Sequence, residues 1–226
     1  MSSLELNVIF LTIKVALLST MITMPIAIFL GWILARKNIF IKPALEAFIS
    51  FPLVAPPVIT GYILLLILGK NGLIGRYLYQ LFNIRLTFNF IALVIASVVV
   101  SLPLAVRSVS SAFTFVDTSY EKASYTLGAS KIATFFRVSL PMAFPGILGG
   151  MILSFARSLG EFGATVTIAG NIAGKTQTIS LMVYSNMQIP GMELHVLRLV
   201  GVSVLISFTA IVLSEIFNKR KGYIKK

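Results

Sequence analysis

The sequence is short of residues that many enzymes use: it has no cysteine, a single histidine (His195) and only 12% charged residues among 226. Without cysteine, disulfides, thiolate metal sites and redox thiols are excluded. One histidine cannot form a histidine-based metal cluster, so we expect no metal site. Soluble domains carry about 25% charged residues, and half that share cannot cover a soluble surface of this size. The composition therefore excludes a typical soluble enzyme.

The chain is instead strongly apolar, with 57% hydrophobic residues and a mean hydropathy of +0.95. A disordered chain is excluded as well, because disorder requires low hydrophobicity. A net charge of +12 and a pI near 10.2 often indicate nucleic-acid binding. Here the basic residues lie between long apolar runs and do not cluster on a polar domain, which favours a membrane protein. We expect the lipid bilayer as a partner and no nucleic acid.

Five segments are long and apolar enough to cross a bilayer, which takes about 20 residues each. The first is too long for a signal-peptide core and lacks a small-residue cleavage site, so we expect it to be retained. The predicted spans cover residues 8–35, 48–69, 86–106, 144–170 and 197–217, with a short N-terminal segment 1–7, a polar loop 107–137 and a basic tail 218–226.

The distribution of Lys and Arg predicts the orientation of the chain in a cell membrane. Basic residues concentrate after the first, third and fifth spans, and the positive-inside rule assigns such segments to the cytoplasm. The N-terminus is then outside and the C-terminus cytoplasmic, as an odd number of spans requires. The cytoplasmic set is Arg36, Lys37, Lys42, Arg107, Lys122, Lys131, Arg137, Lys219, Arg220, Lys221, Lys225 and Lys226, against Lys70, Arg76, Arg85, Lys175 and Arg198 outside.

The second predicted span contains Pro52, Pro56 and Pro57, so it cannot be a regular helix. Each proline removes a backbone donor and clashes with the preceding turn. Broken helix at membrane depth is tolerated where protein buries it or where it lines a wet cavity. The break is therefore either a kink used for packing or part of a translocation pathway, with Thr60 one turn beyond.

The polar loop predicts two short amphipathic helices joined by a glycine. Thr118 and Glu121 have the spacing of a capping box that opens the first helix. Gly128 suits a helix end that needs a left-handed residue, and any side chain there would hold the two helices apart. Ser130 can cap the second helix, which runs through Phe136. Such an element could lie on lipid or dock a soluble partner, and its few scattered basic residues weaken the lipid option.

The same loop resembles the E-A-A-x3-G-x9-I-x-L-P signature of ATP-binding-cassette (ABC) importer permeases. The resemblance rests on Glu121-Lys122-Ala123, Gly128 and Val138-Ser139-Leu140-Pro141, with mild departures at Lys122 and Val138. In that family the loop is a coupling helix that seats in a cleft of a cytoplasmic ATPase. The resemblance implies an all-α membrane bundle of the type I importer permease fold, with ATPase-coupling residues Glu121, Ala123, Gly128, Ala129, Ser130, Leu140 and Pro141.

The fourth predicted span carries Arg157 and Glu161, which are four residues apart and therefore share a helical face. A lone charge at the bilayer centre costs about 2.5–3.5 kcal/mol, whereas a pair turned into the protein is tolerated. The pair either fixes helix packing or serves a pathway, and the nearby glycines, including Gly146-x-x-x-Gly150, permit close backbone approach. The candidate pathway residues are Pro56, Pro57, Thr60, Arg157, Ser158, Gly160, Glu161 and Thr165, with Gly163 beside them.

Residues 170–176 look like a phosphate-binding P-loop, but three residues separate the glycines where that motif has four. No strand pattern precedes them, and no acidic residue is placed to hold magnesium. We therefore expect that the chain is not an enzyme, that it binds no cofactor, and that a separate subunit uses the ATP. The segment is either a plain polar loop or an outer mouth that offers Asn171, Lys175 and Thr176 to an oxyanion.

Three segments resemble the molybdate importer permeases more narrowly: residues 51–61, 157–163 and 170–178. Permeases for tungstate, sulfate and thiosulfate are close relatives, so the choice of oxyanion stays open among these. The resemblance implies a pathway between two copies of the chain, two cytoplasmic ABC ATPase subunits, and an external binding protein that delivers the anion.

Three other classes compete with this hypothesis. A secondary transporter or channel would need no ATPase, and the cytoplasmic signature disfavours it. A membrane enzyme would need a carboxylate pair, a Ser/His pair or a metal set, which the apolar segments lack. A non-transporting scaffold would be recognised by normal anion uptake in its absence.

Overall fold

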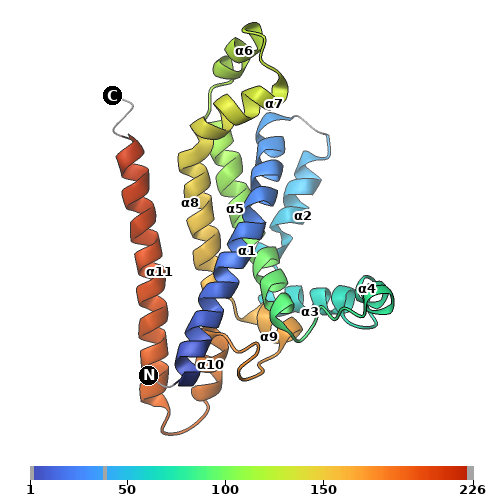
Figure 1. Cartoon of the computed structure of the whole chain (residues 1–226), viewed down its shortest axis with the longest axis vertical. Helices are drawn as coiled ribbons and strands as arrows, with labels where there is room; N and C mark the ends of the chain where they lie inside the picture. Colours follow the sequence, from blue (N-terminus) through green and yellow to red (C-terminus); the bar gives the residue numbers. More distant parts are fainter. Residues whose placement is uncertain (1–2, 38–39, 223–226) are drawn as a thin grey trace.

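The computed structural model describes residues 3–37 and 40–222, with side chains as far as residue 212. Residues 1 and 2 and the predicted tail beyond residue 222 lie outside the described part. The first helix begins at Ser3, so most of the segment predicted as 1–7 belongs to it. The elements are α1 (Ser3–Arg36), α2 (Lys42–Val54), α3 (Pro57–Leu68), α4 (Gly75–Phe82), α5 (Phe90–Thr114), α6 (Thr118–Thr126), α7 (Lys131–Thr134), the π-helix η1 (Phe135–Ser139), α8 (Leu140–Leu159), α9 (Gly163–Ala169), α10 (Ile179–Asn186) and α11 (Glu193–Gly222) (Figure 1).

The centre of the molecule is a bundle of α1, α5 and α8, and small residues let these helices approach closely. A Cβ added at Gly31 would lie 2.8 Å from Cγ1 of Val109, and one at Gly146 would lie 2.5 Å from Cβ of Ala112. At Gly150 an added Cβ would also meet α5, at 3.0 Å. The predicted role of the Gly146-x-x-x-Gly150 pair in close packing is therefore confirmed.

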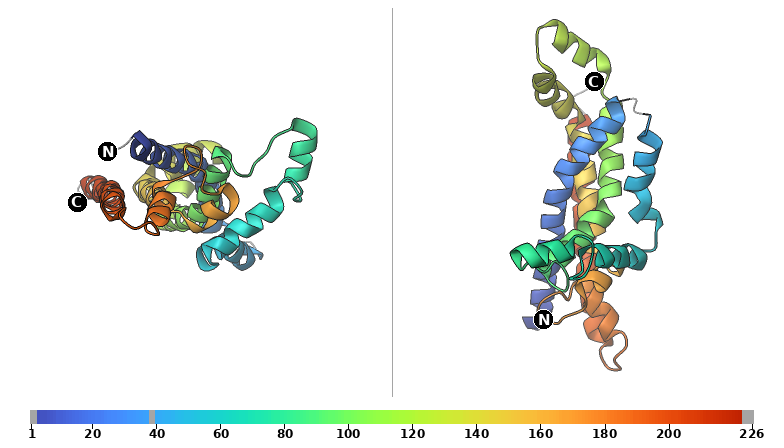
Figure 2. Two further views of the ribbon diagram at one scale, coloured as in Figure 1. Left: turned by 90° about the horizontal axis from the view of Figure 1, so that it is seen from below. Right: turned by 90° about the vertical axis from the view of Figure 1, so that its right-hand side faces the viewer.

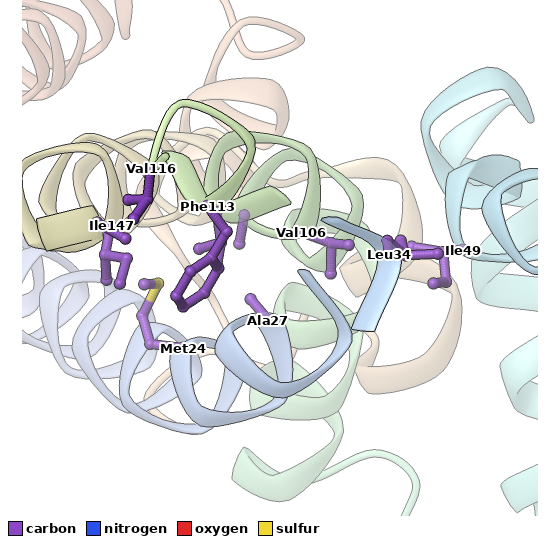
Figure 3. Packing of buried hydrophobic residues seen from close by; sticks show 11 residues of the cluster. Met24, Ala27, Leu34, Ile49, Val106, Phe113, Val116 and Ile147 are labelled. Atoms are coloured by element: carbon purple, nitrogen blue, oxygen red, sulfur yellow. The ribbon is translucent and has the colours of Figure 1, made fainter. Parts of the chain in front are cut away.

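The main apolar cluster fills the space between these three helices (Figure 3). Phe113 of α5 is completely buried there, between Met24 and Ala27 of α1 and Ile147 of α8. Burying a side chain of this size contributes about 1.5–3 kcal/mol, so this cluster holds the end of the bundle that carries α6 and α7. The cluster consists of Met24, Ala27, Leu34, Ile49, Ala105, Val106, Val109, Phe113, Val116, Ala143 and Ile147.

The second predicted span, 48–69, is two helices and not one. α2 begins at Lys42 and runs beside the bundle, and α3 leaves it with a bend of 112°. The break falls at Ala55 because a residue before proline is disfavoured in the helical region; its ψ is 142°. In the described chain, α1, α5, the continuous helix through α8, and α11 are each long and apolar enough to span a membrane. The bent pair makes a fifth span if it is counted as one, as the sequence predicted.

The helices that correspond to the third and fourth predicted spans, α5 and the helix containing α8, also differ from the predicted boundaries. α5 continues to Thr114 and not to residue 106, so Arg107 belongs to a helix and the polar loop is shorter than 107–137. The continuous helix containing α8 runs from Lys131 to Leu159 and not from 144 to 170. It stops at Gly160, and α9 follows as a separate short helix. The fifth predicted span, 197–217, lies within α11.

α3 and α4 form an arm that projects sideways from the bundle (Figures 1 and 2). The arm, residues 57–82, lies toward the same end of the molecule as the N-terminus and α10, whereas α6 and α7 occupy the opposite end. Neither α4 nor α10 was predicted from the sequence.

Candidate functional site

The loop between α5 and α8, called here the coupling loop (residues 115–139), stands at the end of the bundle (Figure 1). Asp117 caps α6 by accepting a hydrogen bond from the N–H of Ser119 at 2.8 Å, and this bond holds the pKa of Asp117 below its usual value. The predicted capping box is therefore incorrect, since the cap precedes Thr118 by one residue. The Glu121 carboxylate makes contacts outside its own helix instead.

Gly128 has a φ of 84°, which confirms the predicted left-handed helix end. The N–H of Ala129 donates to the carbonyl of Ser124 at 3.1 Å and closes the turn. Ser130 accepts from the N–H of Ala133 at 3.2 Å and caps α7 as predicted. A Cβ at Gly128 would meet nothing within 4 Å. Glycine is thus required there by backbone conformation, and the predicted crowding between the two short helices is absent.

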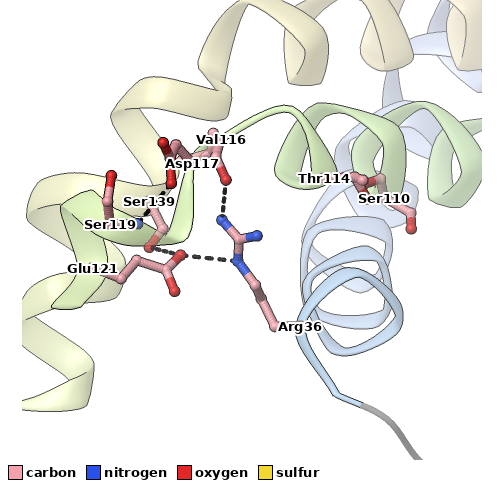
Figure 4. A network of polar contacts seen from close by, with 8 residues as sticks. All are labelled: Arg36, Ser110, Thr114, Val116, Asp117, Ser119, Glu121 and Ser139. Carbon is pink, nitrogen blue, oxygen red and sulfur yellow. Dashed lines mark hydrogen bonds and ion pairs between the residues drawn. The ribbon is translucent and has the colours of Figure 1, made fainter.

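The last residue of α1 anchors the coupling loop (Figure 4). The Arg36 guanidinium donates from Nε to Oε1 of Glu121 at 3.0 Å and from Nη2 to the carbonyl of Val116 at 2.7 Å. Ser139 donates its hydroxyl to the same Glu121 oxygen at 2.8 Å. Both charged side chains are nearly buried, with 11% and 13% of their surface exposed. One carboxylate oxygen therefore joins α1, α6 and η1, a contact that the sequence did not reveal because Arg36 precedes Glu121 by 85 residues.

The position of Glu121 within the importer signature needs correction. The signature has three residues between its second alanine and its glycine, but four separate Ala123 from Gly128. In the stated register, the first three positions are Lys122, Ala123 and Ser124, and Glu121 precedes them. Lys122 is exposed and Glu121 is turned into the protein. The surface that α6 offers to a partner therefore carries a lysine where the signature has an acid.

The coupling loop also exposes large apolar side chains at its tip. Leu127 is 89% exposed and Ile132 is 73% exposed. Apolar side chains grouped on a protruding element are typical of a protein-binding surface. Of the predicted coupling residues, Ala123, Gly128, Ser130 and Pro141 are exposed, Ala129 and Leu140 are half-buried, and Glu121 faces Arg36.

The predicted charge pair is present at the end of α8. Nη1 of Arg157 lies 2.8 Å from Oε2 of Glu161, whose side chain is 2% exposed. Oε1 of Glu161 accepts from the N–H of Ala164 at 2.8 Å, so the same carboxylate satisfies a free donor at the start of α9. The two charges do not share a helix as predicted, because α8 ends at Leu159. The pair instead bridges the break between α8 and α9.

Helical structure is interrupted between α2 and α3 and again between α8 and α9, and the two interrupted segments meet where α3 packs on α9. A Cβ added at Gly61 would lie 2.7 Å from the carbonyl oxygen of Ala164, and one at Gly163 would lie 2.7 Å from Cβ of Pro57. At Gly160 an added Cβ would meet nothing within 4 Å, so close approach is confirmed for Gly163 only. The structure thus places Pro57 against the start of α9, beside the Arg157–Glu161 pair.

Three hydroxyls of the predicted pathway are buried near this joint. Thr165 donates to the carbonyl of Phe162 at 2.9 Å, and Ser158 accepts from Ser19 of α1 at 3.0 Å. The Thr60 hydroxyl has no hydrogen-bond partner among the described residues. Pro56 and Pro57 are exposed.

The predicted outer mouth lies apart from this joint, in the turn after α9. Thr176 is fully buried, and its hydroxyl accepts from the N–H of Ile172 at 3.0 Å. Asn171 donates to the Ser185 hydroxyl at 2.6 Å. Lys175 is exposed. Of the three predicted donors, two therefore hold the turn in shape and Lys175 faces outward.

A comparison with known protein families identifies the class of the protein. Residues 27–223 match the family described as binding-protein-dependent transport system inner membrane components, and the chain belongs to this family. Members are membrane permease subunits of ABC importers, in which a separate subunit hydrolyses ATP. The chain is accordingly a transport component of the inner membrane and not an enzyme.

The relatives narrow the class further. The chain is 46% identical over 217 residues to the molybdenum transport system permease protein ModB of Haemophilus influenzae, covering 96% of this chain and 95% of that protein. It is 41% identical over 211 residues to ModB of Escherichia coli K12, covering 93% and 92%. The sulfate transport system permease protein CysT of Salmonella typhimurium is 32% identical over 212 residues, covering 92% and 76%.

The fold itself has solved counterparts. A chain of the inward-facing MetNI methionine ABC transporter superposes with a TM-score of 0.74 at 16% identity, covering 97% of this chain and 99% of that one. At this identity the likeness concerns the fold alone. It confirms the predicted all-α bundle of the type I importer permease.

Proposed function

We propose that the chain is the membrane permease subunit of an ATP-driven importer for molybdate. The observation that carries the proposal is its similarity to molybdenum permeases over nearly the whole chain, at 46% and 41% identity. The sulfate permease is more distant, at 32%. This order favours molybdate over sulfate, and tungstate is the alternative because the two anions are nearly identical in size and charge.

The proposed assembly has two copies of the chain around a shared pathway, two ABC ATPase subunits in the cytoplasm and an external binding protein. Its orientation places the coupling loop and the C-terminus in the cytoplasm and the N-terminus outside. Support comes from the basic residues near the coupling loop, among them Lys122, Lys131 and Arg137. The proposed pathway passes the joint of α3 and α9.

The contacts of the coupling loop suggest how ATPase movement reaches the membrane helices. ATP binding would close the ATPase pair and move α6 with it. Because Glu121 is bonded to Arg36 and to Ser139, α6 would carry α1 and the helix through α8 along. The bundle would then rock between inward-open and outward-open states as a rigid body. A pathway that releases its anion must bind weakly, so selectivity would reside mostly in the binding protein.

An uptake assay tests the substrate and a binding assay tests the ATPase partner. We expect a strain that lacks the chain to lose uptake of radiolabelled molybdate and to regain it from the wild-type gene, with tungstate competing and sulfate competing weakly. Uptake at the normal rate without the chain would refute the proposal.

Co-purification in mild detergent should recover an ATPase, and Gly128→Asp should lose it. Gly191→Asp is the matched control, because Gly191 is also a left-handed, exposed glycine (φ 86°) but lies in the turn between α10 and α11, which are joined at the opposite end from α6. Failure to recover any ATPase with the wild-type chain would contradict the proposed coupling.

A further inference from the structure

The arm carries positive charge that no carboxylate of the surrounding sequence balances. Residues 47–116 contain no Asp or Glu but include Lys70, Arg76 and Arg85. Lys70 and Arg85 converge on one ring: Nζ of Lys70 lies 4.6 Å and Cζ of Arg85 lies 5.4 Å from the centre of Tyr79. Among the described residues, neither Lys70 nor Arg85 forms an ion pair with a carboxylate.

The two cations line a cavity of about 550 Å³ between the arm and the start of α5. Asn71 and Thr87 line it as well and can donate hydrogen bonds. Lys70 and Arg85 are both exposed, so a ligand can reach them. The positive character of the site also acts on Tyr79, whose pKa is lowered by a hydrogen bond from Arg85 and by the charge of Lys70.

An anion in the cavity would be attracted to both Lys70 and Arg85, because the two cations line it and share the Tyr79 ring. A tetrahedral oxyanion suits this pair, because arginine presents a planar fork of donors to its oxygens and lysine adds a compact charge. The cavity therefore has the charge, the donors and the opening of an oxyanion-binding site.

The carboxylates at this end of the molecule have partners within the chain. Toward this end the structure describes the acidic residues Glu5, Glu161 and Glu193, and Glu161 pairs with Arg157 at 2.8 Å. Glu5 pairs with His195 at 2.9 Å, and Glu193 accepts from the N–H of Gly191 at 3.2 Å. The carboxylates that the structure describes at this end are thus engaged within the chain, and we consider a membrane lipid or a free oxyanion as the ligand.

The surroundings of the cavity favour a membrane source. Beside the two cations, α4 and the turn before it expose apolar and aromatic side chains, among them Leu73, Tyr77 and Leu81, at 78%, 64% and 73%. Basic residues next to exposed apolar and aromatic ones are typical of a helix at the level of lipid headgroups. A headgroup phosphate at the cavity would leave the acyl chains beside these residues.

We propose that Lys70 and Arg85 bind a tetrahedral oxyanion group in this cavity, supplied by the phosphate of a membrane lipid or by a free oxyanion. The site is separate from the proposed pathway at the joint of α3 and α9, and it does not depend on which anion the protein transports.

Two arms of one binding experiment separate the sources, both using the purified full-length chain in a neutral detergent after lipid depletion. In the first arm, phosphatidylglycerol is added and bound lipid is counted by native mass spectrometry, with the matching diacylglycerol as a phosphate-free control. In the second arm, inorganic phosphate is titrated by calorimetry. Phosphatidylglycerol binding without diacylglycerol binding identifies lipid, whereas saturable phosphate binding identifies a free oxyanion.

The variants decide whether the bound group occupies this cavity. We expect Lys70→Gln with Arg85→Gln to weaken binding about tenfold or more, because the charge-assisted hydrogen bonds of both cations to the anion are lost. Arg85→Lys keeps the charge and should weaken it less. Arg76→Gln is the matched control, because Arg76 is exposed on the same arm but does not line the cavity.

Three results would overturn the proposal: no saturable binding in either arm, an unchanged affinity in the double variant, or an equal loss in Arg76→Gln, which would indicate diffuse attraction to a basic surface. The substituted side chains are exposed, and a size-exclusion profile like that of the wild type checks that the variants fold.

Discussion

The Arg36 anchor leads to a prediction that a double-mutant cycle can test. Arg36→Gln removes two hydrogen bonds to the coupling loop and leaves the Glu121 carboxylate with the Ser139 hydroxyl. Hydrogen bonds to charged groups contribute about 1.5–3 kcal/mol when one partner is removed. The small remaining exposure of both charged side chains weakens their interaction, so we expect a coupling energy near the lower end, about 1–2 kcal/mol.

Hydrogen exchange of the α6 backbone amides measures this energy as the free energy of local opening. Four proteins are compared: the wild type, Arg36→Gln, Glu121→Gln and the double variant. Each single change should speed α6 exchange by about fivefold to thirtyfold, because 1.4 kcal/mol corresponds to a factor of ten. The double variant should lose less free energy of local opening than the sum of the losses in the two single variants. Lys122→Gln, exposed on the same helix, should leave exchange unchanged.

The reasoning fails if the two single effects add within about 0.3–0.5 kcal/mol, the limit for independent sites. Additivity would mean that the arginine and the carboxylate hold α6 separately and that their contact contributes nothing. An effect of Glu121→Gln without any effect of Arg36→Gln would show that Glu121 holds α6 through Ser139 and not through Arg36.

Three further predictions concern the glycines and the buried charge pair. Gly128→Ala should weaken α6 by about 1 kcal/mol or more in the same exchange measurement because of its positive φ, whereas Gly128→Asn should cost less. Gly163→Ala should lower the thermal midpoint of the purified chain because its new methyl group meets α3 at 2.7 Å, and Gly160→Ala, with open space around it, should not. Arg157→Ala should destabilise the chain by about 1–3 kcal/mol because it strands the buried Glu161 carboxylate, and adding Glu161→Gln should recover part of the loss. Unchanged assembly and uptake in Arg157→Ala would show that the pair has neither a structural nor a transport role.

The sequence predicted the helical class, the long apolar helices and the first short helix of the coupling loop, because each depends on local composition or local turn chemistry. The second short helix was wrong in extent, because the helix that Ser130 caps continues without a break from Lys131 to Leu159. It ended the third helix too early, since serines at 108, 110 and 111 resemble a loop. Val109 and Phe113 keep facing the core across that stretch, and tertiary packing decides the outcome.

The prolines showed that the second segment breaks but not where α3 would go. The direction of α3 depends on its contact with α9, which lies about a hundred residues further along the chain and follows a second helix break. The Arg36 anchor was missed for a similar reason. A basic residue at a helix end is read as a marker of orientation, and its partner can be recognised only in space.

The π-helix η1 sets the rotational phase between the coupling loop and α8. A π-turn accommodates one residue more than an α-helix would in the same stretch, and each residue of an α-helix turns the chain by about 100°. Deleting one residue within η1 would therefore swing α7 and α6 about the axis of α8 by roughly that angle. Glu121 would then leave Arg36 although α1, α6 and α8 kept their lengths. The single extra residue of η1 thus keeps the coupling loop in register with the C-terminal end of α1.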